Sequence, residues 1–271
     1  MIEIKKIPLD QITQLKQSYM KLTTAPLDGM WLTGFVPMAT HYGFFEQTEL
    51  VGFCCLNADG YLLQFFINSQ FRDQTAQVFK NLVGNRYNTV PPLSGAFTST
   101  AEPFVLALCL DNFSNFEVNA LMFELPHNGN FSENFQAEVS LKTLEMGGLE
   151  PAVDFAHAAI GAPKEWLVGY YGTLIKRQEL FGLWQDNVLI ATGEARGYDE
   201  FQTEYADLGV IVAKAEQNKG LATKILKTLA HQTRKNGLTP ICSTEATNIP
   251  AQKAISKAGF FSQNRIIEFK A

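Results

Sequence analysis

The sequence predicts a mixed α/β fold in which one arrangement of strands and helices occurs twice along the 271 residues. Apolar runs at strand spacing and at helical spacing alternate, and they do so in the same order in both halves. Between the halves lies a segment with Pro126, the triplet Asn128-Gly129-Asn130 and no strong periodicity, which is typical of a linker. We therefore predict a first domain at residues 1–126 and a second at residues 127–271.

The C-terminal half shows this order most clearly. It predicts strand, strand, strand, helix, strand, helix and strand at residues 180–184, 188–195, 205–212, 219–236, 240–244, 248–259 and 265–269. The turn Gln185-Asp186-Asn187 joins the first two strands as a hairpin. Leu221, Ile225 and Leu229 recur at helical spacing, and Asn236-Gly237 ends that helix.

The N-terminal half repeats the order with slight sequence identity to the other half. Its elements, in the same succession, are predicted at residues 42–46, 50–56, 61–67, 72–83, 95–99, 103–110 and 117–125. The turn Gln47-Thr48-Glu49 takes the place of the later hairpin turn. This succession indicates two copies of one fold.

Composition and charge exclude several classes of protein. With 46% hydrophobic residues the chain fits an ordinary globular protein, and no apolar run approaches the roughly 20 residues that span a bilayer. The first residues lack the apolar region of a secretory signal, so we expect a cytoplasmic protein without a membrane partner. The net charge of −5 argues against nucleic acid as the main partner and is compatible with a cationic small-molecule substrate.

The four cysteines follow no metal-binding pattern. Cys54 and Cys55 are adjacent on a predicted strand, whereas Cys109 and Cys242 stand alone in apolar surroundings. The sequence contains neither Cys-x-x-Cys nor His-x-x-x-His. We interpret all four as buried, reduced and inert thiols, and we expect no metal.

The segment at residues 212–222 has the properties of a pyrophosphate-binding loop. It leaves a predicted strand, turns and enters the amphipathic helix, with small residues at Gly220 and Ala222. At the start of a helix several backbone N–H groups lack internal partners and the helix dipole is positive, which favours a bound anion. Small side chains let the backbone approach the phosphates closely.

This loop and a second block downstream resemble the GCN5-related N-acetyltransferases. The family's loop is (Gln or Arg)-x-x-Gly-x-(Gly or Ala), and Gln217, Gly220 and Ala222 occupy those places. The stretch from Asn248 to Gly259-Phe260 is similar to the family's second block, an Asn, a short helix and a closing Gly-Phe. The resemblance covers residues 180–269, and more loosely 163–177. It implies a central mixed, mostly antiparallel sheet flanked by helices, with two adjacent parallel strands that splay apart.

The resemblance implies acetyl-CoA as co-substrate, held between the splayed strands at residues 208–212 and 240–245. Backbone N–H groups near Val210 to Val212 would hold the pantetheine arm and polarise the thioester carbonyl. The implied cofactor-binding residues are Val210, Ile211, Val212, Gln217, Asn218, Lys219, Gly220, Leu221, Ala222, Thr223 and Asn248. Asn248 is equally an N-cap of its helix, and a solvated helix face explains Lys219 as well as phosphate binding does.

The family mechanism is direct attack of an amine on the acetyl thioester, for which a carboxylate removes a proton from the amine. Three acids lie on the strands around the splay, Glu194, Asp207 and Glu245, and the sequence does not rank them. An ion pair with Arg196 is the structural alternative for Glu194. Many family members also carry a Tyr that protonates the departing thiolate, and here Ile255 stands in its place. A thiol has a pKa near ~8.5, so the thiolate can leave without that acid.

The first copy departs from the family pattern at the corresponding loop. Residues 67–75 contain no glycine, and Phe71 and Asp73 would crowd and repel a pyrophosphate. We therefore expect one cofactor site in each chain. The first copy is expected to be structural or to cover the substrate site of the second.

Together these features predict an acetyl-CoA-dependent N-acetyltransferase that acts on the primary amine of a small molecule. Two alternatives remain at this stage. One is acetylation of a protein or peptide amine, and the other is a non-catalytic CoA-binding sensor, which Ile255 and the degenerate first copy favour. The acceptor and the oligomeric state have no motif in the sequence.

Overall fold

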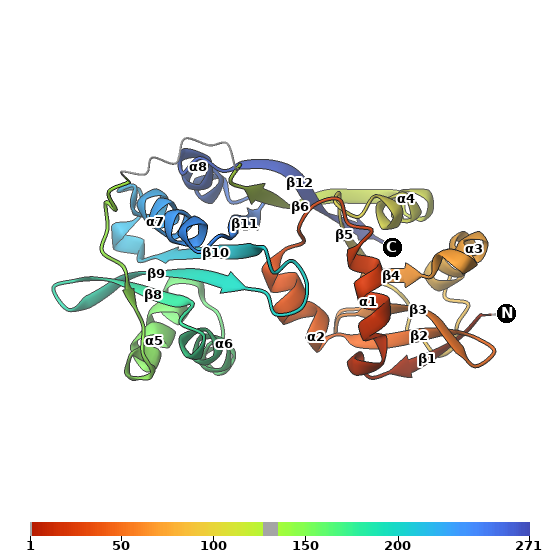
Figure 1. Ribbon diagram of the computed structural model, residues 1–271. Helices are drawn as coiled ribbons and strands as arrows, with labels where there is room; N and C mark the ends of the chain where they lie inside the picture. The colour runs from red at the N-terminus through yellow and green to blue at the C-terminus, as the bar shows by residue number, and fades with distance from the viewer. Residues whose placement is uncertain (1, 127–134) are drawn as a thin grey trace. The chain divides into compact units, whose positions relative to one another are not determined.

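The computed structural model describes residues 2–126 and 135–271 (Figure 1). The chain divides into two compact units. The first unit comprises residues 1–121, 245–247 and 264–271, and the second comprises residues 122–244 and 248–263. The C-terminal residues thus belong to the first unit, which the sequence pattern does not indicate. The triplet Asn128-Gly129-Asn130 of the predicted linker lies outside the described residues.

The first unit is built on a largely antiparallel sheet with strand order β1-β2-β3-β4-β5-β12. Its strands are β1 (Ile2–Ile7), β2 (Thr40–Glu46), β3 (Glu49–Leu56), β4 (Tyr61–Ile67), β5 (Gly95–Ser99) and β12 (Phe261–Lys270). The next strand after β5 along the chain is β6 (Asn115–Glu124). Its helices are α1 (Thr13–Met20), α2 (Val36–Met38), α3 (Arg72–Val83) and α4 (Pro103–Asn112), with short helical turns at Leu9–Ile12, Trp31–Phe35 and Ser69–Phe71. The parallel pair β4 and β5 is joined through α3, as a parallel connection requires.

The second unit contains the sheet order β11-β10-β9-β8-β7. Its strands are β7 (Lys142–Thr143), β8 (Leu180–Gln185), β9 (Val188–Gly197), β10 (Tyr205–Val212) and β11 (Thr239–Glu245). Its helices are α5 (Leu149–Ile160), α6 (Lys164–Lys176), α7 (Leu221–Lys235) and α8 (Ile249–Lys257), with short turns at Met146–Gly148 and Lys214–Glu216. The predicted mixed α/β fold with two copies of one arrangement is confirmed.

Helices cover both faces of the second unit's sheet (Figure 1). The α5–α6 pair packs its apolar side on one face, in a cluster that includes Leu167, Tyr171 and Leu189. On the other face Leu229 and Ile225 of α7 lie against Gly193. Since side chains alternate along a strand, the residues that flank Gly193 point toward α5 and α6.

All four cysteines are buried and unbridged. Burial raises the pKa of the Cys55 and Cys109 thiols to about 12, so neither forms a thiolate at neutral pH. The interpretation as inert thiols therefore agrees with the structure.

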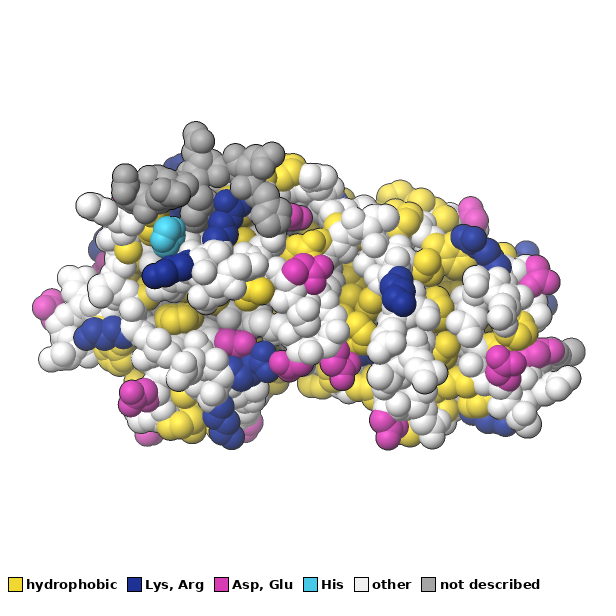
Figure 2. Space-filling model, viewed as in Figure 1, with side chains coloured by type: hydrophobic (Ala, Val, Ile, Leu, Met, Phe, Trp, Pro, Cys, Tyr) yellow, Lys and Arg dark blue, Asp and Glu magenta, His cyan; other side chains and the backbone are white. Residues whose placement is uncertain are grey.

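Within the described residues, no helix is both long and apolar enough to cross a membrane. On the face shown in Figure 2, Lys and Arg side chains are scattered among acidic ones.

Candidate functional site

The parallel strands β10 and β11 separate partway along their length. They pair at Tyr205–Thr239, Ala206–Pro240 and Asp207–Ile241. Beyond Asp207, β10 continues to Val212 paired with β9 on its other edge. The splay implied by the family resemblance is present, and it frees one edge of the β10 backbone at Leu208–Val212.

The loop after β10 opens the N-terminal end of α7. Asn218 and Gly220 take left-handed backbone conformations, with φ of 63° and 79°, and Leu221 begins the helix. The first backbone N–H to reach a carbonyl four residues earlier is that of Lys224, which donates to Gly220 O at 3.2 Å. The N–H groups of Leu221, Ala222 and Thr223 therefore remain outside the helical hydrogen-bond ladder.

Space is open on the side of the loop where phosphates would bind. A Cβ atom built on Gly220 would meet no atom within 4 Å. The Gln217 side-chain amide donates to Val212 O at 3.3 Å and closes the turn back onto β10. The ammonium group of Lys219 lies 2.9 Å from Glu216 in an exposed ion pair, which is weak enough to yield to a phosphate.

Residues of the second family block, from Asn248 to Phe260, stabilise the fold of the second unit. The Asn248 side chain accepts a hydrogen bond from the Ala251 N–H at 3.2 Å and so caps α8. Ile255, which stands where the family often has Tyr, is buried in the core. Ser256 beside it is exposed.

Two of the three candidate acids meet at one arginine. The Arg196 guanidinium lies 3.1 Å from Glu194 Oε2 and 2.8 Å from Asp207 Oδ2. The Tyr170 hydroxyl donates to the same Glu194 Oε2 at 2.6 Å and accepts from Arg196 Nη1 at 2.6 Å. We call Tyr170, Glu194, Arg196 and Asp207 the acidic cluster. The structural alternative considered for Glu194, an ion pair with Arg196, is present, and Asp207 shares it.

Strand register explains how the acidic cluster assembles. In the β9–β10 ladder Asp207 is opposite Arg196, and Gly209 is opposite Glu194. Opposite residues point to the same face of a sheet, so all four positions face α6, which contributes Tyr170. A Cβ atom on Gly209 would lie 3.1 Å from Glu194 Oε2, so this glycine makes room for the carboxylate over β10. The sequence carries no motif for Tyr170, because its partners are on other elements.

The electrostatics of the acidic cluster favour a neutral tyrosine and a charged arginine. Burial raises the pKa of Tyr170, and the neighbouring Glu194 charge raises it further. Burial alone would lower the pKa of Arg196, but the charges of Asp207 and Glu194 and the Tyr170 hydroxyl raise it well above its usual range. In the acidic cluster the two carboxyl groups, those of Glu194 and Asp207, share one guanidinium.

Glu245, the third candidate, is the last residue of β11 and its side chain is exposed.

The first copy keeps the splay but not the open loop. Its parallel strands pair only at Tyr61–Gly95 and Leu62–Ala96. Where the second copy has a glycine before its helix, the first copy has Phe71, which packs against the buried apolar side chains of the first unit. At the entry to α4, buried Glu102 accepts hydrogen bonds from the Tyr19 hydroxyl of α1 and, at 2.7 Å, from the Ser99 N–H. Protein side chains thus fill the end of this splay.

Glu102 predicts a pH dependence of stability. Burial raises its pKa from 4.5 to about 7, so the folded first unit binds this proton more tightly than the unfolded chain does. The resulting stabilisation is fully present below pH 4.5 and is lost as the pH rises through 7. When the pH is lowered from 8 to 5, the unfolding free energy of the wild-type protein should rise by up to about 3 kcal/mol more than that of Glu102→Gln. Denaturant unfolding at both pH values measures this difference, and equal pH dependence of the two proteins would contradict it.

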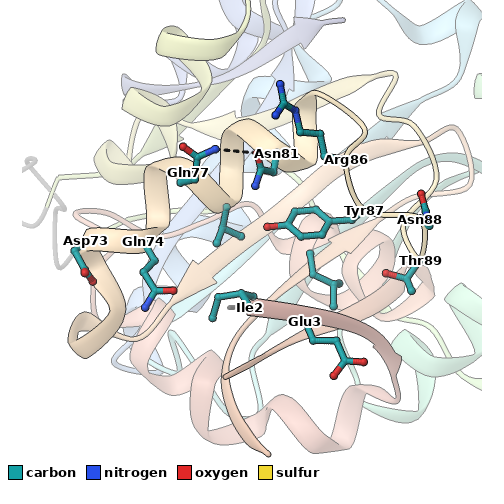
Figure 3. A pocket seen from close by; sticks show the side chains of 12 residues that line it. Ile2, Glu3, Asp73, Gln74, Gln77, Asn81, Arg86, Tyr87, Asn88 and Thr89 are labelled. Atoms are coloured by element: carbon teal, nitrogen blue, oxygen red, sulfur yellow. Dashed lines mark hydrogen bonds between the residues drawn. The ribbon is translucent and has the colours of Figure 1, made fainter. Parts of the chain in front are cut away.

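The first unit also carries a groove with a volume of about 770 Å³ between β1 and α3. Figure 3 shows the Tyr87 ring lying across it, near Gln74 and Asn81 of α3 and Ile2 of β1. None of the predicted site residues lines this groove.

Family models match both halves of the chain. Residues 8–125 match the Acetyltransferase (GNAT) domain, and residues 153–260 match the Acetyltransferase (GNAT) family. No curated protein matches the sequence. The predicted tandem arrangement is confirmed by the two family models.

Solved structures give the same result. An acetyltransferase from the GNAT family of Colwellia psychrerythraea is 45% identical, with 99% of each chain covered and a TM-score of 0.94. A tandem GNAT protein from the clavulanic acid biosynthesis pathway is 14% identical, with 100% of this chain and 98% of that chain covered and a TM-score of 0.64. A GCN5-related N-acetyltransferase from Sphaerobacter thermophilus is 12% identical over 99% of this chain and 95% of its own, with a TM-score of 0.62. At such low identity the last two show the fold alone.

Proposed function

Since this chain belongs to the GNAT family of acetyltransferases, we propose that it transfers the acetyl group of acetyl-CoA to the primary amine of a small molecule. The cofactor site lies in the second unit. The observation that carries the proposal is the open N-terminal end of α7 directly after the splayed part of β10.

The residues of the second unit fit the parts of acetyl-CoA in order along the chain. The free N–H groups of Leu221, Ala222 and Thr223 suit the pyrophosphate, and Gly220 lets it approach. The β10 backbone at Val210–Val212, which β11 has left, suits the pantetheine arm and the thioester carbonyl.

Acetyl transfer to an amine requires that a proton leave the ammonium group and that the departing thiolate be neutralised. A carboxylate, directly or through a water molecule, takes one proton from the bound ammonium so that the nitrogen lone pair can form a bond to the acetyl carbon. The carbon–sulfur bond then breaks, and the second proton lost by the nitrogen neutralises the CoA thiolate. Glu194, Asp207 and Glu245 are the candidate bases. Because Ile255 is buried and apolar, the thiolate leaves without a tyrosine acid at this position.

Two observations favour a second candidate function. The apolar Ile255 and the filled splay of the first copy also suit a module that binds CoA without turnover. Such a sensor would bind acetyl-CoA and release no thiol with any acceptor.

Two measurements test the proposal. Isothermal titration should show acetyl-CoA binding with one site per chain, and absence of binding at millimolar cofactor would overturn the assignment. A thiol-release assay with a panel of amines should then show turnover. Binding without turnover across small amines and peptides would establish the sensor instead, and turnover with peptides alone would establish a protein acetyltransferase.

A further inference from the structure

The sheet of the first unit ends in a long edge strand. β1 is the last strand of this sheet and, among the described residues, pairs only with β2. All six of its residues, Ile2 to Ile7, pair with β2 in one continuous register. Backbone groups alternate in direction along a strand, so every second residue of β1 directs its N–H and C=O away from β2. We call this side of the strand the β1 edge.

The corresponding edge of the second copy is short. The order β7-β8-β9-β10-β11 repeats the order β1-β2-β3-β4-β5, so β7 corresponds to β1. β7 has two residues, whereas β1 has six. Very short edge strands, bulges, prolines and charged lysines are the usual means by which proteins prevent association through sheet edges. β1 contains no proline and no bulge, and the ammonium group of Lys5 lies 3.0 Å from the Glu3 carboxylate.

The groove between β1 and α3 makes the β1 edge accessible. Three consecutive residues of β1, Ile2 to Ile4, line this groove, although successive side chains of a strand point to opposite faces. The strand therefore borders the groove with its edge. Residues of α3 and the Tyr87 ring form the other wall, and about 770 Å³ lies between them (Figure 3).

The symmetry of a dimer limits how two copies of β1 can pair. Two identical antiparallel strands are related by a twofold axis perpendicular to the sheet, so residues opposite each other point to the same face. Ile2 and Ile4 belong to the apolar cluster that α3 covers, and the side chains of Glu3 and Lys5 point to the other face. Each possible register is therefore centred on one residue, which lies opposite itself in the second copy.

Charge selects one of these registers. Registers centred on Glu3, Lys5 or Lys6 place identical charges opposite each other, and registers centred on either end of β1 pair only a few residues. The register centred on Ile4 instead places Glu3 opposite Lys5 of the second copy, and does so twice. The order of charges in β1 is thus complementary to itself in this register alone.

From this complementarity we infer that the β1 edge binds the β1 edge of a second copy of the chain, antiparallel and centred on Ile4. Glu3 and Lys5 already pair within each strand, so four charges alternate in sign on one face of the dimer. On the other face Ile4 lies opposite Ile4 of the second copy. The sheets of the two first units become continuous through this contact. The inference does not depend on acetyl transfer.

Sedimentation velocity of the full chain over a range of concentrations tests this interface, and the wild-type protein should form a reversible dimer. Glu3→Lys and Lys5→Glu each place like charges opposite each other at both pairs, so each should raise the dimer Kd about tenfold or more. The two side chains are 61% and 51% exposed, so both variants should keep the wild-type circular dichroism spectrum. Lys6→Glu makes the same change of charge opposite Ile2 and is the matched control, with little change in Kd.

Mixing the two weakened variants tests the register. Glu3→Lys carries two lysines and Lys5→Glu two acids at these positions, so an equimolar mixture should form a heterodimer with a Kd close to that of the wild type. The double variant Glu3→Lys/Lys5→Glu should also dimerise.

Three results would overturn the inference. A wild-type chain that stays monomeric at submillimolar concentration would exclude a second copy as the partner and leave the β1 edge to a peptide or to solvent. A dimer with the same Kd in all variants would place the interface elsewhere. Weakening in the single variants without recovery in the mixture would exclude the register centred on Ile4.

Discussion

Gly220→Asp is expected to abolish measurable acetyl-CoA binding by isothermal titration. The substitution places a side chain in the space now open beside the loop and a negative charge where the pyrophosphate is proposed to bind. It also acts on a residue with φ of 79°, a conformation that side chains other than glycine adopt at a cost of about 1 kcal/mol. The position is exposed, so the fold should persist and the circular dichroism spectrum should be unchanged.

The opposite end of the same helix offers a matched control. Gly237 follows α7, has φ of 78°, and a Cβ atom built on it would likewise meet nothing within 4 Å. Gly237→Asp therefore carries the same backbone strain and the same charge, far along the helix from the proposed phosphates. It should retain cofactor affinity, as should Gln70→Ala in the first copy. Equal loss of binding in both glycine variants would mean that strain, and not the phosphate site, is responsible.

Arg196→Leu should lower the unfolding free energy of the protein by about 3–5 kcal/mol. The side chain holds Glu194 and Asp207, and without it two buried carboxylates lose their common counterion. Arg196→Lys keeps the charge but lacks the planar fork that reaches both acids, so its loss should be smaller. Denaturant unfolding followed by tryptophan fluorescence measures the effect, since Trp166 and Trp184 both lie in the second unit.

Arg177 supplies the comparison for this second result. It also binds two acids, Glu179 and Asp199, but the Asp199 side chain is 76% exposed and the Arg177 side chain 33% exposed. Water screens such pairs, so Arg177→Leu should cost about 1 kcal/mol or less. Equal losses of unfolding free energy in Arg196→Leu and Arg177→Leu would show that burial of the acidic cluster does not strengthen its ion pairs.

The elements of the second unit could be predicted closely because their signals are local. The strands at 205–212 and 239–245 and the helix from 221 follow from the spacing of apolar residues along the chain itself. The loop could be predicted for the same reason: Gln217, Gly220 and Ala222 lie within six residues, between a predicted strand and an amphipathic helix, with the Asn248–Phe260 block downstream.

Other features depend on residues that are distant in sequence. Tyr170 meets Glu194 across 24 residues, and β12 at the C-terminus pairs with β5 from residues 95–99. No periodicity encodes such contacts, because each strand or helix shows which face is apolar but not which partner covers it. The predicted set of three acids could not be ranked from the sequence for this reason.

The sequence by itself determined the duplicated fold, the loop at Gln217–Ala222 and its absence from the first copy, since each depends on the order of neighbouring residues. Only the tertiary structure decided that Arg196 binds both Glu194 and Asp207 and that Tyr170 joins them. The physical reason is strand register: pairing across β9 and β10 sets which side chains share a face, and packing of α6 sets what covers them. The fold therefore decides which charged side chains meet in the acidic cluster.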